Sequence, residues 1–202
     1  MCIRDRYVST ASALQKANGA KLLGLFSNEE MFEQRPEGEG DVYDPQPTLE
    51  TMTSKALSTL SKSRKGFFLF VEEEGVDEFS HENNGEKMLK SMAALDRTVG
   101  MLRTYVAKHP NTLLVVTGDH DCGGLTVEDT GTTDESGDGI SAEDGPFTVA
   151  GSNSQFDLDW TTSGHTGVPT PVTAVGPGSS DLTGVYQNTH VHSVLQRVLL
   201  GR

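Results

Sequence analysis

Carboxylate and imidazole side chains, the common ligands of catalytic metal ions, gather in three short stretches of this sequence. The candidate ligands are Glu72, Asp77, His81, Asp119, His120 and His165. Asp77 and His81 are four residues apart, so a helix would place them on one face. Imidazole with carboxylate suits zinc, whereas an oxygen-only ligand such as Glu72 suits magnesium. The pattern predicts a clustered metal site of the kind that performs phosphoryl chemistry.

Two apolar runs predict the buried strands that position these ligands. The run 67–72 ends at Glu72, and the run 112–117 ends just before Asp119 and His120. Parallel strands in open α/β sheets present their ligand-binding groups at their carboxyl ends. We therefore expect the fold, and not one local loop, to build the site.

Hydrophobic spacing and turn residues predict the remaining elements. Helices are expected over 9–19, 49–60, 83–109 and 189–200, and further strands at 21–26 and 171–175. Apolar residues recur at intervals of three and four along the longest helix, at Met88, Met92, Leu95, Val99, Leu102 and Val106. A strand, a helix and a second strand in this order form a crossover that requires parallel strands. The expected fold is α/β, a mostly parallel sheet with helices on both faces, incomplete at its N-terminus.

Each candidate ligand also has an ordinary interpretation, as a solvated acid or a surface histidine. Three separate segments with the same side-chain types favour one shared site over three coincidences. His109 ends a predicted helix beside a proline, and His190 and His192 are two residues apart and cannot share a helix face. We therefore expect these three histidines not to be metal ligands.

Composition excludes some classes of function. The chain has 16 basic and 29 acidic residues, a net charge of −13, and so lacks the basic clusters that hold nucleic acid. No apolar run approaches the ~20 residues that span a bilayer. The two cysteines leave the redox compartment undecided.

An acidic, glycine-rich stretch over 128–145 is expected to be a solvated loop inserted in the domain. Asp134, Ser136, Asp138 and Gly139 match the opening positions of a calcium-binding EF-hand loop. The match then fails, because the twelfth position, which should be a bidentate Glu, is Gly145.

The chain resembles the alkaline phosphatases, specifically the C-terminal half of their catalytic domain, over roughly residues 20–201. The resemblance is carried by V71-E-x4-D-x3-H81, V115-V-T-G-D-H120, G164-H-T-G167 and A174-V-G-P-G178. It implies that Asp77, His81 and His165 hold one zinc, that Asp119 and His120 help to hold a second, and that Glu72 binds magnesium. It also implies two Zn²⁺ and one Mg²⁺ as cofactors and hydrolysis of phosphate monoesters through a phosphoserine.

The serine nucleophile of that family, in an Asp-Ser-Ala type motif, is not identifiable, since the sequence contains no Asp-Ser dipeptide. We expect residues 7–202 to be the C-terminal portion of one such domain, residues 1–6 to be a non-native leader, and the chain alone to have negligible turnover. Glu78 stands where relatives often have Lys or His, and Cys122 stands where several have a hydrogen-bonding His.

Two alternatives stay open. One is a related phosphodiesterase or sulfatase of the same superfamily, which Glu72 disfavours because a third metal site is typical of the monoesterases. The other is a non-catalytic metal-binding remnant. Family resemblance further implies a periplasmic or extracellular enzyme, often a homodimer, although the sequence shows no signal peptide.

Overall fold

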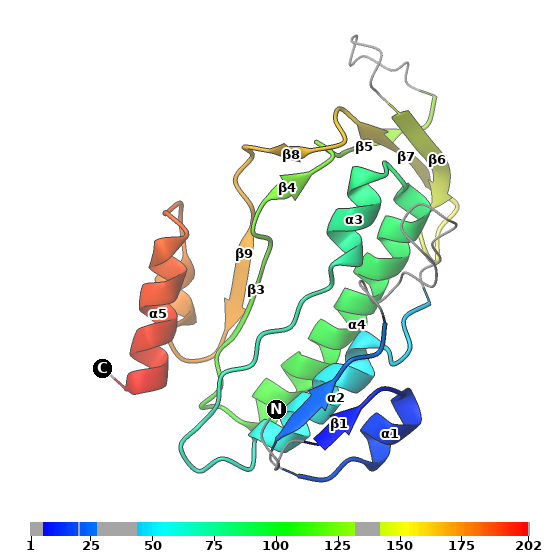
Figure 1. The fold of residues 1–202 in the computed structure, drawn as a ribbon. Coiled ribbons are helices and arrows are strands. Elements are labelled where there is room, and N and C mark those ends of the chain that lie inside the picture. The colour runs from blue at the N-terminus through cyan, green and yellow to red at the C-terminus, as the bar shows by residue number, and fades with distance from the viewer. Residues whose placement is uncertain (1–5, 20, 28–43, 132–141, 202) are drawn as a thin grey trace. The chain divides into compact units, whose positions relative to one another are not determined.

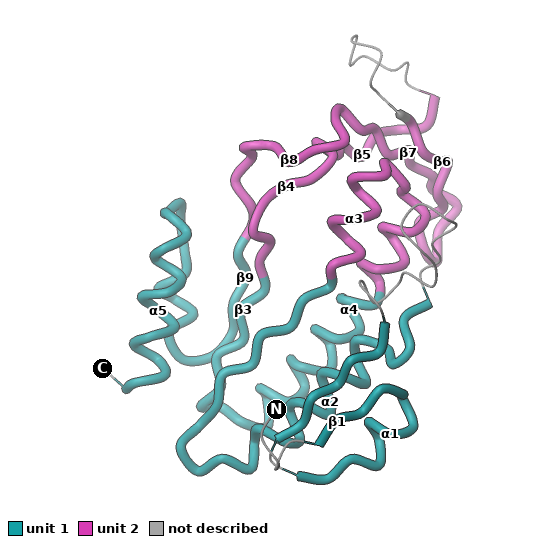
Figure 2. Tube along the Cα trace, in the orientation of Figure 1, with its two compact units in different colours: residues 1–73, 94–116, 172–202 teal, residues 74–93, 117–171 magenta. Residues whose placement is uncertain are grey.

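The computed structural model describes residues 6–19, 21–27, 44–131 and 142–201 (Figure 1). The helices are α1 Ala11–Lys16, α2 Leu49–Leu60, α3 Gly75–His81, α4 Gly85–Lys108 and α5 Thr189–Leu200, with a 3₁₀ turn at Ser179–Leu182. The strands are β1 Arg6–Val8, β2 Leu22–Gly24, β3 Leu114–Thr117, β4 Asp121–Cys122, β5 Thr126–Asp129, β6 Ala142–Thr148, β7 Gln155–Trp160, β8 His165–Thr166 and β9 Val172–Val175. The chain divides into two compact units, which Figure 2 colours separately.

Unit 1 comprises residues 1–73, 94–116 and 172–202. β1 pairs in parallel with β2, and β3 lies beside β9 (Figure 1). Val8, Leu14 and Ala17 form a small buried cluster, against which Met52 of α2 packs. The hydroxyl of Thr48 accepts a hydrogen bond from the Thr51 backbone, so it caps the N-terminus of α2.

Unit 2 comprises residues 74–93 and 117–171, and it contains most of the candidate ligands. Its sheets are antiparallel: β4 pairs with β8, and β7 pairs with both β5 and β6. Phe79 of α3 and Leu158 and Trp160 of β7 are almost fully buried. The Trp160 ring lies against Gly123, the residue that follows β4.

The helices agree with the sequence pattern, but the buried stripe of α4 differs from the predicted one. Met88 and Val106 are buried, whereas Met92 is 41% exposed. Ser91 and Thr98 are buried in its place, and their hydroxyls donate to carbonyls one turn back, Met88 O and Ala94 O. Hydrophobicity alone missed this because a hydroxyl that bonds its own helix can be buried at little cost.

The expected parallel sheet is not found among the strands that the structure describes. β1 and β2 pair in parallel, whereas the pairings of β4, β5, β6, β7 and β8 are antiparallel. The predicted strand 67–72 has no strand assignment, and Phe68 and Phe70 are exposed. An apolar run becomes a strand only when a neighbour takes its backbone hydrogen bonds, so the predicted crossover lacks its first strand here.

Several sequence expectations fall wholly or partly outside the described residues. The 1–6 leader overlaps the undescribed residues 1–5, and the four opening positions of the rejected EF-hand match lie within 132–141. The two ends of the predicted 128–145 loop are described, and they belong to β5 and β6. No helix in the described part of the chain is both long and apolar enough to cross a bilayer.

Candidate metal centre

α3 supplies the first two candidate ligands, as the four-residue spacing predicted. The helix begins after Glu74, whose carbonyl accepts hydrogen bonds from the backbone N–H groups of Asp77 and Glu78. Asp77 lies in its first turn and His81 in its last. The acid is therefore at the helix end that favours negative charge, and the imidazole is at the end that favours positive charge.

The β4–β8 ribbon supplies two more groups, Cys122 and His165. In its antiparallel register these two residues are direct partners, which places their side chains on the same face. The ribbon is held by a hydrogen bond from Gly123 N to Gly164 O at 3.0 Å and by one from the Thr166 hydroxyl to Asp121 at 2.6 Å. The short strands thus fix two donor groups side by side.

Asp77, His81 and His165 converge. The Nε2 atoms of His81 and His165 are 3.0 Å apart. Asp77 Oδ2 lies 3.5 Å from His81 Nε2, and Asp77 Oδ1 lies 3.5 Å from His165 Nε2. Two imidazoles and a carboxylate that face one common point form a ligand set suited to zinc.

A backbone carbonyl fixes which nitrogen of His81 faces this point. His81 Nδ1 lies 2.6 Å from Ser163 O, and because a carbonyl only accepts, Nδ1 must donate. In a neutral imidazole this leaves the lone pair on Nε2, toward His165. Zinc-ligating histidines are typically held in this way by a carbonyl or carboxylate on the second nitrogen.

Two buried polar atoms at this point, Asp77 Oδ1 and His120 Nδ1, have no hydrogen-bond partner among the described residues. They lie 3.8 Å apart, which is too far for a direct hydrogen bond. Buried polar atoms are normally satisfied, so two unpaired buried atoms that face each other call for a cation or an ordered water. The residues present therefore fit a metal ion.

Cys122 joins the same cluster. One ligand atom from each of Asp77, His81, Cys122 and His165 can be chosen so that all four lie within 4.8 Å of one another. Burial, followed by the Asp77 carboxylate, raises the pKa of the Cys122 thiol to about 12 in the metal-free protein. The thiol is therefore protonated at neutral pH unless a cation stabilises its thiolate.

The other predicted ligands, His120, Asp119 and Glu72, differ in how closely they approach this cluster. The ring of His120 stacks on that of His165 with centroids 3.5 Å apart, so it belongs to the cluster. Asp119 lies 3.4 Å from His120 Nε2, but its side chain is 86% exposed. Glu72 is exposed and belongs to unit 1, and its role as a magnesium ligand stays a prediction.

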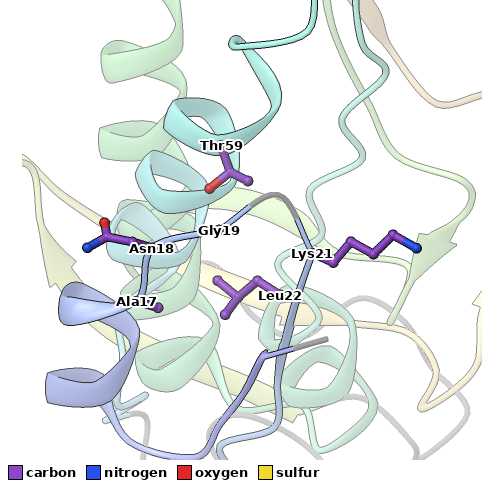
Figure 3. A pocket seen from close by; sticks show the side chains of 6 residues that line it. All are labelled: Ala17, Asn18, Gly19, Lys21, Leu22 and Thr59. Carbon is purple, nitrogen blue, oxygen red and sulfur yellow. The ribbon is translucent and has the colours of Figure 1, made fainter. Parts of the chain in front are cut away.

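A shallow depression in unit 1 is a separate feature (Figure 3). Its lining residues carry no carboxylate or imidazole, and they are Ala17, Asn18, Gly19, Lys21, Leu22 and Thr59. It therefore offers no ligand set comparable with the cluster of unit 2.

The sequence interpretation missed Ser163 and assigned Cys122 only a hydrogen-bonding place. Ser163 acts through its backbone carbonyl, which no side-chain pattern reveals. The sequence signal for Cys122 was its position two residues after His120, since alternate residues of an extended segment share a face. The pairing with His165 could not be read without the register.

Taken together, the described residues define an α/β protein with a candidate metal centre of carboxylate, imidazole and thiol groups. The chain belongs to the alkaline phosphatase family, because the profile of that family matches residues 4–151. This confirms the resemblance inferred from the sequence motifs.

Comparison with individual proteins agrees. The chain is 24% identical to alkaline phosphatase 4 of Bacillus subtilis (strain 168) over 241 residues, covering 96% of this chain and 51% of that protein. It is 31% identical to alkaline phosphatase of Escherichia coli (strain K12) over 157 residues, covering 77% of this chain and 32% of that protein. The chain thus spans about half of one relative and a third of the other.

Solved structures show the same fold. A cold-active alkaline phosphatase from a psychrophilic Shewanella species matches with a TM-score of 0.73 and 24% identity, covering 96% of this chain and 59% of that one. A variant of the TAB5 alkaline phosphatase, with Mg bound in its M3 site, matches with a TM-score of 0.70 and 24% identity, covering 98% and 53%. An alkaline phosphatase-like fold is therefore established for this chain.

Proposed function

We propose that this chain is the metal-binding part of an alkaline phosphatase that hydrolyses phosphate monoesters. The observation that supports this best is the convergence of Asp77, His81 and His165 in a chain of that family. The proposal extends the site to a second zinc at Asp119 and His120 and to magnesium at Glu72. Family resemblance also favours an exported enzyme.

When bound, paired zinc ions would stabilise the attacking and leaving oxygens of a displacement at phosphorus. The chain's own residues have definable tasks in such a site. Ser163 O orients the His81 ring, and the β4–β8 ribbon holds His165 across from it. Asp77 would supply the negative charge that balances part of the charge of a bound cation. Because the chain is acidic overall, a phosphate anion would be attracted only locally, by the bound cations.

Zinc binding by the full 202-residue chain tests the ligand set. We expect His165→Ala to weaken zinc affinity by at least about 100-fold, more than loss of an outer hydrogen-bond partner typically costs. His109→Ala is the matched control, because His109 stacks on Tyr105 in unit 1 and should leave affinity unchanged. Calorimetric titration with Zn²⁺ measures both. Equal affinities of the two variants would contradict the assignment.

Substrate class is tested on the zinc-loaded chain. We expect inorganic phosphate and a phosphate monoester to bind, with a diester and a sulfate ester weaker, and turnover of the monoester to be negligible for want of the serine nucleophile. Preferential binding of the diester or the sulfate ester would favour the superfamily alternatives. Robust serine-dependent hydrolysis by the purified chain would refute the expected lack of turnover.

A further inference from the structure

Cys122 lies where a fourth metal ligand would lie. Its cluster with Asp77, His81 and His165 has all four ligand atoms within 4.8 Å of one another. Zinc–sulfur and zinc–nitrogen bonds of about 2.3 and 2.0–2.1 Å require neighbouring ligand atoms roughly 3.3–3.6 Å apart in a tetrahedron that contains one sulfur. The Nε2 atoms of His81 and His165, 3.0 Å apart, would separate slightly, and the most distant pair of the four would close by at most about 1.5 Å.

The ribbon makes this more than a chance approach. Cys122 and His165 are direct antiparallel partners, so the sulfur and the imidazole are fixed on one face. His165 Nε2 in turn lies 3.0 Å from His81 Nε2. The hydrogen bond from His81 Nδ1 to Ser163 O leaves the lone pair of the neutral His81 ring on this Nε2 atom. Each member of the set is positioned by backbone pairing or by a backbone hydrogen bond, independently of any metal.

We propose that Cys122 is a direct fourth ligand of the metal ion that Asp77, His81 and His165 hold. This rests on the proposed metal site but goes beyond it, since that site needs no thiol. On binding, the S–H bond breaks, the sulfur keeps the electron pair and donates it to the metal, and the proton leaves to the solvent. One thiolate and one carboxylate then balance a divalent cation among two neutral imidazoles.

The proposal has a structural consequence. Three protein ligands leave an open position on zinc, as catalytic sites require, whereas four close the tetrahedron, as structural sites do. A phosphate oxygen could reach this ion only if the sulfur leaves or the ion accepts a fifth ligand. The thiolate would also favour softer metals than a carboxylate–imidazole site alone does.

Cobalt substitution tests this directly. The experiment uses the full chain with Cys2→Ser, which leaves Cys122 as its one thiol. We expect Co²⁺ to give sulfur-to-cobalt charge-transfer absorption that disappears on Cys122→Ser while the weaker ligand-field bands persist. Zn²⁺ affinity should fall by more than about 100-fold in the same variant, beyond the 10–100-fold typical of an outer partner. Fluorescence of Trp160, the chain's one tryptophan, checks that the variant folds.

The possible results separate the two proposals. Ligand-field bands without charge transfer in the Cys2→Ser chain would overturn the role of Cys122 and leave the three-ligand site standing. A 10–100-fold loss of affinity without charge transfer would make Cys122 a hydrogen-bond partner of Asp77 and also overturn it. If Co²⁺ and Zn²⁺ do not bind the folded chain at all, the metal site and the Cys122 ligand fail together.

Discussion

Individual atoms in unit 2 show how local contacts prepare a site for a cation. The Ser163 carbonyl sets the tautomer of His81, and the unpaired Asp77 Oδ1 faces His120 and His165. None of these interactions contributes much as a surface ion pair, because all four side chains are partly exposed to water. Their value lies in orientation, and orientation is what a ligand set needs.

The raised pKa of the Cys122 thiol should make the stability of the metal-free chain depend on pH, which can be tested in the Cys2→Ser background. Its pKa rises from an ordinary 9.0 to about 12 on folding, first through burial and then through Asp77. Between about pH 9 and 12 the folded chain therefore keeps a proton that the unfolded chain has lost, so stability falls as pH rises through this range.

Alkylation by iodoacetamide measures this shift, because only the thiolate reacts. At pH 9 we expect the folded chain to react at least tenfold more slowly than the urea-unfolded chain. Asp77→Asn removes the nearby negative charge and should speed the reaction of the folded chain. Equal rates for folded and unfolded chains would show that the thiol is not protected.

At the scale of elements, one asparagine joins the end of α3 to the segment that leads to His165. Asn83 has a positive φ of 51°, and its side-chain amide donates to Ser80 O and Thr162 O. Such a backbone conformation is tolerated by Asn and Gly and is costly for other residues. The same side chain thus fits the turn and secures the loop.

Two substitutions at this position separate backbone from side chain. Asn83→Gly keeps the backbone conformation and loses two hydrogen bonds, so we expect the free energy of unfolding to fall by about 1–2 kcal/mol. Asn83→Ala adds the strain of a left-handed alanine, about 1–2 kcal/mol more. Urea unfolding followed by Trp160 fluorescence measures both. Equal losses would mean that the positive φ carries no cost.

Gly123 tests the contact between the β4 ribbon and the core of unit 2. It has φ +79°, and a Cβ there would clash with the buried ring of Trp160. Gly131 has a similar φ of +82°, and no atom of the described residues lies within 4 Å of its Cβ position, so it is the matched control. We expect Gly123→Ala to destabilise the chain by about 1–3 kcal/mol more than Gly131→Ala in the same unfolding assay. Similar losses would show that the ring can move aside.

The sequence predicted the helices well and the sheets poorly, for a physical reason. Periodicity within a helix is local, so α1, α2, α4 and α5 could be placed from their own residues. A strand is defined by its partner, and the sequence does not show that β4 pairs with β8 or that 67–72 has no strand partner among the described residues. The candidate ligands could be proposed from residue types, but that Cys122 lies beside His165 could be seen only from the strand register.

At the scale of the whole molecule, the two units should respond differently to metal. Asp77, His81, His120, Cys122 and His165 all lie in unit 2. A ligand that binds only the folded state stabilises it by about 2.7 kcal/mol at a concentration 100 times its Kd. We therefore expect zinc to slow amide hydrogen exchange in residues 74–93, 117–131 and 142–171, and chelation to reverse it.

Unit 1 is the internal control for that experiment. The guanidinium of Arg197 in α5 donates a hydrogen bond to Asp181 in the 3₁₀ turn. Neither residue is a candidate metal ligand. Zinc should leave exchange in α5 unchanged. Protection confined to unit 1, or spread equally over both, would contradict a metal centre built from unit 2.

The contact between His81 and His165 joins residues 84 positions apart. Closing a flexible loop of that length costs about 4 kcal/mol of chain entropy before any added constant. In the unfolded chain the imidazoles of His81 and His165 are not held together, so a cation that needs both binds weakly. It reaches its full affinity only after β8 has paired with β4. Metal binding should therefore follow the closure of this loop during folding, and the time at which the metal binds would show when the loop has closed.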